Sequence, residues 1–566
     1  MFNNEKIIET KTCKHCQSSF EITDKDLEFY QKVSPSFGGK KYNIPPPTLC
    51  PDCRYQLVLS SRNERNLYKR TCDATGKPII SIYSPDKPYK VYSQDIWWSD
   101  NWNALGYGKD FDFSKTFFEQ FGELFKNVPK VNLNSPLSHN SEYTNQSQCL
   151  KNCYMMFCSG ESEECFYGMW YERCKYCVDC LYIEDSEYCY ELINCINCYK
   201  CFFSKNLLSC RDVYFSSNLN NCQNCIGCVN LDNKQYYIFN KESSKEEFEQ
   251  YLENIKTKGS SFIGDLHKKT YGFFQNFPKK YYNGRQNENC FGDYLQNNKN
   301  AYFGFNCRDN EDTKYCKDTW VSKISYDLIE ILQVDYSLLV EGTAFANHCL
   351  FTAKSNTVSE VYYSSHCNFS DHLFGCVGLK NKSYCILNKQ YTKEEYEMLV
   401  PRIIEHMMKT QEWGEFFPSS ISPFGYNETV AQEYFPISRD KALPYLYKWS
   451  DYEPPFPKVD KIIPANKLPE NISDIPDDIL NRAIECEITK RPFRIIKQEL
   501  DFYRKNNLPI PKRHPDQRHL DRMKLRNPRK LFDRKCDKCG KYIKTTYSPD
   551  RKEIVYCEEC YNKEIC

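Results

Sequence analysis

The chain has 566 residues, 76 lysine and arginine against 75 aspartate and glutamate side chains, and a net charge of +1. This length predicts several domains, and the balanced charge excludes a chain that is drawn as a whole to nucleic acid or to an anionic membrane. The N-terminal segment is polar and no run of about 18 apolar residues occurs, so we expect neither a signal peptide nor a membrane span. We therefore interpret the 33 cysteines as reduced thiols and metal ligands of a cytoplasmic protein, not as a disulfide framework.

Two cysteine pairs near the N-terminus have the spacing of a zinc site. Cys13 and Cys16 form one C-x2-C pair, and Cys50 and Cys53 form a second. Structural zinc is held by four ligands in a tetrahedron, which leaves no open position for a substrate. The second pair leads into a segment with helical character, RYQLVLSSRNE, as in treble-clef zinc fingers. We predict a zinc module over residues 1–130.

The cysteines in the middle of the chain recur in threes. From Cys153 to Cys228 all but Cys158 share one phase of a three-residue period, and the six cysteines from Cys307 to Cys385 share another. Longer spacings of 18 and 21 residues suit one coil of a parallel β-helix. Cysteine is small and weakly apolar, so ladders of it can fill a narrow interior. We predict a mainly β, duplicated solenoid; a polyproline II bundle shares the period but needs more glycine.

The solenoid is predicted in two halves, residues 131–258 and 259–410. The end of the first half, from position 228, matches the end of the second at an offset of 148 residues. Each end carries a capping box, with Ser244 and Glu247 in one and Thr392 and Glu395 in the other, which predicts an amphipathic helix after it. Each helix would cover the open end of a stack of strands, whose edges would otherwise invite aggregation.

Some of these residues also permit a metal-binding interpretation. The C-x2-C-x2-C clusters at 174–180, 195–201 and 222–228 resemble part of an iron–sulfur motif, but the fourth cysteine and its proline are missing. His348 and His366 lie 18 residues apart and would stack on the outside if that spacing were one coil. We favour packing for the cysteines and unrelated surface positions for the histidines.

The C-terminal module, residues 471–566, follows a Pro- and aromatic-rich strap over residues 411–470 and repeats the N-terminal module. The match has an offset of 473 residues, which becomes 464 after a nine-residue difference in one loop. One zinc site is intact in each copy, so we expect two zinc ions per chain. The C-terminal ligands are Cys536, Cys539, Cys557 and Cys560. The degenerate sites hold Cys72, Thr75, Ser93 and Ile96 in the first copy, and Cys486, Thr489, His514 and Gln517 in the second.

The C-terminal module also carries the one strong charge patch of the sequence. Residues 487–544 hold 19 lysines and arginines against 7 acidic residues. Such a patch can bind nucleic-acid phosphates, or it can be an ordinary solvated surface. The candidate nucleic-acid-binding residues are Arg513, Arg518, Arg522, Lys524, Arg526, Arg529 and Lys530.

Six short segments carry a resemblance to known proteins: CPDCR (50–54), NKQY (388–391), KEEYE (393–397), EWGEFFP (412–418), SPFGYNET (422–429) and LPIPKRHPDQRH (508–519). Through them most of the chain resembles uncharacterised cysteine-rich, zinc-ribbon proteins of candidate-phyla bacteria, with modules like treble clefs. The resemblance brings no activity with it. It implies cysteines in relatives where this chain has His514 and Gln517, which argues against a zinc ion at that site.

No known catalytic motif occurs in the sequence. The best candidates are Asp371 and His372 beside Cys376, and Glu341 near His348. We therefore expect a non-enzymatic, zinc-binding scaffold or interaction protein, whose partner is an unknown protein or a nucleic acid bound by the basic C-terminal module. The alternative is an enzyme that acts on a polysaccharide or another polymer in a groove of the solenoid.

Overall fold

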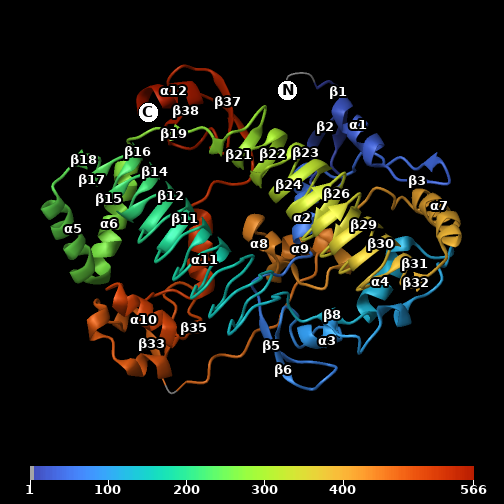
Figure 1. Cartoon of the computed structure of the whole chain (residues 1–566), viewed down its shortest axis with the longest axis horizontal. Helices are drawn as coiled ribbons and strands as arrows, with labels where there is room; N and C mark the ends of the chain where they lie inside the picture. Colours follow the sequence, from blue (N-terminus) through green and yellow to red (C-terminus); the bar gives the residue numbers. More distant parts are fainter. Residues whose placement is uncertain (1–4, 460, 566) are drawn as a thin grey trace.

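The computed structural model describes residues 5–459 and 461–565, and two solenoid-like arms of parallel strands form its centre (Figure 1). The first arm runs through the strands β9 (Met169–Glu172), β10 (Leu181–Glu184), β11 (Tyr190–Ile196), β12 (Phe202–Leu208), β13 (Arg211–Tyr214), β14 (Ser217–Asn220), β15 (Gln223–Ile226), β16 (Val229–Asp232) and β17 (Gln235–Ile238). Parallel bridges extend it back to His139. Strands thus dominate the middle of the chain, as predicted.

The second arm repeats this arrangement. Its strands are β20 (Gly284–Arg285), β21 (Phe291–Gln296), β22 (Lys299–Arg308), β23 (Glu311–Lys314), β24 (Lys317–Tyr326), β25 (Ile329–Asp335), β26 (Leu338–Glu341), β27 (Ala344–Asn347), β28 (Leu350–Ala353), β29 (Asn356–Tyr362), β30 (Asn368–Phe374) and β31 (Ser383–Ile386). Short antiparallel strands, β18 (Lys241–Glu242) and β32 (Lys389–Gln390), close the two sheets.

One winding of each arm takes twelve residues. Leu181 pairs with Ile193 in the first arm, and Lys317 pairs with Ile329 in the second. The prediction of an 18- or 21-residue coil is therefore wrong. Those spacings are multiples of three but not of twelve, so they join cysteines on different sides of the winding. The ladder that the structure stacks is Cys153, Cys165, Cys177, Cys189 and Cys201, in steps of twelve.

Every third residue of the arms has a left-handed backbone conformation, which accounts for the three-residue period. Asn152, Tyr176 and Asn194 have φ angles of 53°, 53° and 54°. Asparagine adopts this conformation more readily than most residues, and several corners stack asparagines coil on coil; Asn194 donates to Asn206 at 3.3 Å. The residue after each such corner points inward.

Some inward positions hold large apolar side chains such as Leu192 and Val213, while at others a small polar side chain accepts an inward N–H of the next winding. Ser186 Oγ accepts the N–H of Cys198 and donates to the carbonyl of Glu184. Cys180 Sγ likewise accepts the N–H of Leu192, at 3.3 Å, and donates to Val178 O. In this narrow interior, cysteine and serine can therefore each accept an inward N–H and donate to a backbone carbonyl.

Helices follow each arm, and both predicted capping boxes are confirmed. Ser244 and Glu247 cap α5 (Lys245–Thr257), which continues into α6 (Gly259–Phe274). Thr392 and Glu395 cap α7 (Lys393–Lys409). Phe248 and Ile255 of α5 are buried in the core that includes Ile226 of the last windings.

The two end modules repeat one pattern, a hairpin followed by a helix, twice each. In the first module the elements are β1 (Ile7–Thr12), β2 (Ser19–Thr23), α1 (Asp24–Val33), α2 (Pro51–Leu59), β5 (Tyr68–Thr71), β6 (Pro78–Ser81), β7 (Val91–Tyr92) and α3 (Gln94–Trp98). In the second they are β34 (Ala483–Glu485), β35 (Pro492–Phe493), α10 (Lys497–Lys505), α11 (Pro515–Lys524), β36 (Phe532–Lys535), β37 (Tyr542–Thr545), β38 (Val555–Tyr556) and α12 (Glu558–Ile565). The sequence duplication is thus also a duplication of structure.

In its described part, the segment over residues 411–470 contains α8 (Val430–Tyr434), α9 (Arg439–Ala442), short 3-10 turns and β33 (Ile462–Pro464), which pairs with β34 of the C-terminal module. It packs the buried side chains of Trp413, Phe416 and Tyr426 into the core shared with α2, α4 (Phe117–Asn127) and α7. In the described part of the chain, no helix combines the length and apolar character that crossing a membrane requires.

Candidate metal centres and the seam between the arms

The four N-terminal cysteines come together as predicted. Cys13 and Cys16 lie in the turn between β1 and β2, while Cys50 and Cys53 lie at the start of α2. Their sulfur atoms all lie within 4.8 Å of one another, and Cys16 Sγ is 3.7 Å from Cys50 Sγ. The Cys50 N–H donates to Cys13 Sγ at 3.3 Å. Hydrogen bonds to Cys53 and the other thiols lower the pKa of Cys50 to about 5.

The C-terminal cluster has the same geometry. Cys536 and Cys539 lie between β36 and β37, and Cys557 and Cys560 lie at the start of α12. Cys539 Sγ is 3.7 Å from Cys557 Sγ, and the Cys557 N–H donates to Cys536 Sγ at 3.3 Å. Although burial opposes it, backbone N–H groups of Cys557 and Cys539 lower the pKa of Cys536 to about 6.

Both clusters fit a metal ion that prefers four sulfur ligands in a tetrahedron. A metal–sulfur bond of about 2.3 Å, the length typical of zinc, gives a tetrahedral edge of about 3.8 Å. The 3.7 Å separations match that edge. Cys50 and Cys536 have a lowered pKa and release their protons readily, whereas hydrogen bonds and burial raise the pKa of Cys53, Cys557 and Cys560, so metal binding must displace the protons of these thiols.

The degenerate sites keep the hairpin but not the ligands. Cys72 Sγ accepts the N–H of Ser93, and Cys486 Sγ accepts the N–H of Thr489. His514 Nδ1 accepts the N–H of Asp516 and so caps α11. Within the described ranges, neither position gathers three metal-ligating groups.

The cysteine triplets of the arms do not converge. Cys174 Sγ donates to the carbonyls of Glu172 and Ile183, and Cys177 Sγ donates to those of Lys175 and Ser186. Successive triplet members lie on successive sides of a twelve-residue winding. Among the residues that the structure describes, they form no group of three or more ligands, so the packing interpretation is the better one.

The other candidate pairs are also separated. His348 pairs with Glu360 at 2.8 Å, and His366 contacts Ser365, because positions 18 residues apart fall on opposite corners of a winding. Glu341 points to a different partner, Arg62, and does not pair with His348. Asp371 and His372 are in contact at 2.7 Å on a half-exposed face.

Most of the candidate nucleic-acid-binding side chains contact the protein itself. Arg518 and Arg522 are buried and both pair with Asp179 of the first arm. Arg529 pairs with Asp318 at 2.6 Å. Arg526 donates to Asn306 and lies 4.0 Å above the ring of Tyr182. Arg513 pairs with Glu487 and Asp521 at a half-exposed position, while Lys524 and Lys530 are exposed.

The N-terminal module docks by the equivalent residue. Arg54 is the counterpart of Arg518 at the 464-residue offset, and Asp327 is the counterpart of Asp179 at the 148-residue offset. Arg54 binds Asp327 through two nitrogens, and both side chains are buried. The same position of the duplicated module therefore enters an arm in both copies. Arg54 of the first module enters the second arm, and Arg518 of the second module enters the first.

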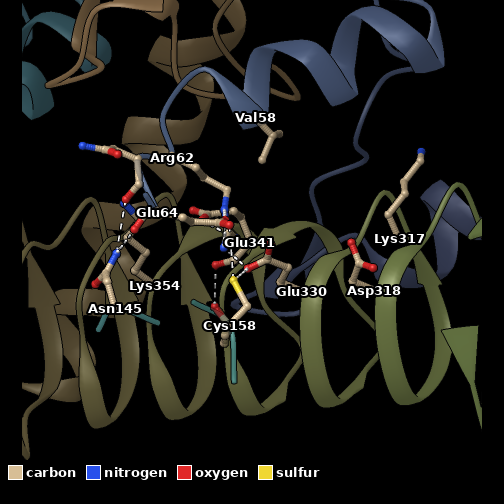
Figure 2. A network of polar contacts seen from close by, with 12 residues as sticks. Val58, Arg62, Glu64, Asn145, Cys158, Lys317, Asp318, Glu330, Glu341 and Lys354 are labelled. Atoms are coloured by element: carbon tan, nitrogen blue, oxygen red, sulfur yellow. Dashed lines mark hydrogen bonds and ion pairs between the residues drawn. The ribbon is translucent and has the colours of Figure 1, made fainter. Parts of the chain in front are cut away.

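A buried network joins the first module to both arms, as Figure 2 shows. Arg62 pairs with Glu64 and Glu341, at 2.7 Å each, and with Glu330. Cys158, the cysteine outside the three-residue phase, donates from Sγ to Glu64 at 3.2 Å. Burial raises the pKa of Glu64 and of Cys158. Since the thiol stays protonated and Arg62 supplies the positive charge, this cluster is an internal ion network.

The two arms meet along a seam in which their chain directions oppose. Asn206 accepts from Tyr294, at 3.0 Å, and Tyr182 donates to Asp318 at 2.8 Å. Beside this seam lies a cleft of about 430 Å³. Among its lining residues are Trp170, Glu172, Tyr182, Glu184, Asn194, Ile196, Asn206, Leu208, Asn218, Arg308, Trp320 and Tyr561. The sequence offered no signal for this cleft, because its two walls come from different arms.

No family model matches this sequence, and no curated protein matches it.

Proposed function

We propose that this chain is a non-enzymatic scaffold protein, stabilised by two structural zinc ions. The observation that carries the proposal is the matched docking of the end modules, through Arg54 to Asp327 and through Arg518 to Asp179. Each docked module holds one cluster of four cysteines. A rigid pair of arms fixed by its own end modules suits presentation of a binding surface.

Several finer features belong to this proposal. The hairpin–helix modules are treble-clef-like, and the ion in each is zinc because four thiolates in a closed tetrahedron suit zinc. The arms are β-helices with a twelve-residue coil. The described cysteines are all free thiols, which supports a reducing compartment, the cytoplasm.

Binding of nucleic acid by the C-terminal module receives less support. Lys524 and Lys530 are the exposed members of the seven candidate residues, while Arg518, Arg522 and Arg529 serve intramolecular ion pairs. Few free cations mean few released counterions, so affinity for phosphates should be weak.

Elemental analysis of the purified chain tests the zinc proposal, with two zinc ions expected per molecule. The Cys539→Ser variant should retain one ion, because it removes a ligand of the C-terminal cluster. Cys486→Ser is the matched control from the degenerate site and should retain two. Zinc near zero or four per chain, or stoichiometric iron, would contradict the assignment.

A further inference from the structure

The cleft beside the seam has walls of two chemical kinds. Trp170 stacks on Tyr182 at 5.4 Å and meets Trp320 edge to face at 6.2 Å, which places aromatic surface from both arms in one place. Neither indole N–H has a hydrogen-bond partner among the described residues. Asn194, Asn206 and Asn218 add a column of amides, one per winding, next to the aromatic end. Asn194 donates to Asn206, and Asn218 donates to Asn230 and Tyr561, so the Asn206 Nδ2 and the side-chain oxygens of Asn194 and Asn218 are the groups without a partner among the described residues.

Most charges in the cleft are already paired; Arg285, which has no ion pair among the described residues, donates to the side-chain amide of Gln296 at 3.5 Å. Glu184 binds Arg308 across the seam at 2.6 Å, and Asp318 binds Arg529. Lys280 pairs with Glu558 at 3.2 Å. A polyanion or a polycation would have to break such pairs, so the cleft favours a neutral ligand.

Backbone recognition of a peptide strand does not fit this cleft. Ile196 and Leu208, on its first wall, pair with each other in the parallel sheet, and Leu208 also pairs with Asn220. On the second wall, Arg308 and Trp320 are paired in the same way. The backbone groups there are used between windings, which leaves no free strand edge for β-augmentation.

We propose that this cleft binds a neutral oligosaccharide. A sugar ring presents an apolar C–H face, which suits the rings of Trp170 and Trp320, and hydroxyl groups, which suit amides and indole N–H donors. A cleft of about 430 Å³ lies within the range of small-molecule sites. The proposal rests on the scaffold function above and names the class of its ligand.

The C-terminal metal cluster supports one wall of this site. Cys557 and Cys560 fix the start of α12, and Tyr561 of the same helix receives a hydrogen bond from Asn218 at 2.6 Å. Tyr561, Asn562 and Ile565 of α12 line the cleft. The cluster thus orders part of the binding surface without touching the ligand.

Isothermal titration of the full chain with cellohexaose, maltohexaose and fully N-acetylated chitohexaose, after a screen on an array of neutral glycans, tests the proposal. We expect at least one neutral glycan to bind, and Trp320→Ala to weaken its affinity by about tenfold or more. Phe345→Ala is the matched control, because Phe345 is a 50% exposed aromatic side chain on the same arm outside the cleft. It should leave the affinity unchanged.

Three results would overturn the proposal: no binding by any neutral glycan, equal binding by the Trp320→Ala variant with unchanged circular dichroism, or preference for heparin or polyuridylate. Zinc content, measured on the same samples, separates these failures from a failure of the scaffold proposal. A chain with two zinc ions and no glycan affinity would refute the ligand class alone.

Discussion

Small inward-facing side chains of the arms contribute hydrogen bonds as well as packing volume. In a purely apolar ladder, a serine in place of cysteine would cost about 1–3 kcal/mol and an alanine less. Ser186 nevertheless occupies such a position, where it satisfies both a carbonyl and an inward N–H. A cysteine there is a donor and an acceptor that also fills space.

At Cys180, alanine should therefore be more destabilising than serine, which is the reverse of the order expected in a purely apolar ladder. Cys180→Ser keeps an acceptor for the Leu192 N–H and should change the free energy of unfolding by less than about 1 kcal/mol. Cys180→Ala leaves that buried N–H unpaired and should cost about 1–3 kcal/mol. Urea denaturation of both variants measures the difference, and a more stable alanine variant would restore the apolar-ladder interpretation.

Glu191 should make stability depend on pH. Burial, with the nearby Asp179 carboxylate, raises the pKa of Glu191 from 4.5 to about 7. The folded state then binds more protons than the unfolded state, so stability falls as pH rises from about 4.5 to 7. Glu191→Gln should raise the melting temperature at pH 8, leave it nearly unchanged at pH 4.5, and flatten the profile between. An identical profile in wild type and variant would exclude Glu191 as the cause.

At the scale of elements, the helix α2 depends on one buried ion pair. Arg54→Met would leave the buried Asp327 without its partner and should cost about 3–5 kcal/mol. Adding Asp327→Asn should recover much of this loss, because asparagine is neutral and tolerates the φ of 56° at that position.

Arg513→Met is the control for that experiment. Arg513 pairs with Glu487 at a half-exposed position, so its loss should cost less than about 1 kcal/mol. Urea unfolding of Arg54→Met, of Arg54→Met combined with Asp327→Asn, and of Arg513→Met measures these costs. Similar losses of unfolding free energy in Arg54→Met and Arg513→Met would contradict the docking role of the buried pair.

The sequence predicted the local elements well and their long-range partners poorly. The cysteine pairs and the capping boxes of α5 and α7 were readable because their signals span few residues. The winding length could not be read from the sequence, since a three-residue period is compatible with a winding of any multiple of three residues. The partner of Arg518 lies 339 residues away, and only its alignment with Arg54 could have suggested an intramolecular role.

At the scale of the molecule, the arms and the end modules should differ in their need for metal. The windings are held by backbone bonds and buried ladders, whereas the hairpin at each four-cysteine cluster has only a small apolar core. Chelation should therefore expose these hairpins, residues 7–23 and 532–545, to protease while the β-type circular dichroism persists. If protease resistance and the β-type circular dichroism were lost together, the modules and the arms would unfold as one unit.

The twelve-residue register also sets how an arm can change length. Inserting twelve residues adds one winding and returns every later side chain to its own face. Inserting three would shift each later residue to the next side, so that inward positions stay inward while the aromatic and asparagine columns leave the seam. The first winding of the second arm shows that the end of an arm tolerates a winding of another length, because Glu288 pairs there with Lys299, eleven residues on. Arms of this type should thus differ in length by whole windings, with smaller changes confined to their ends.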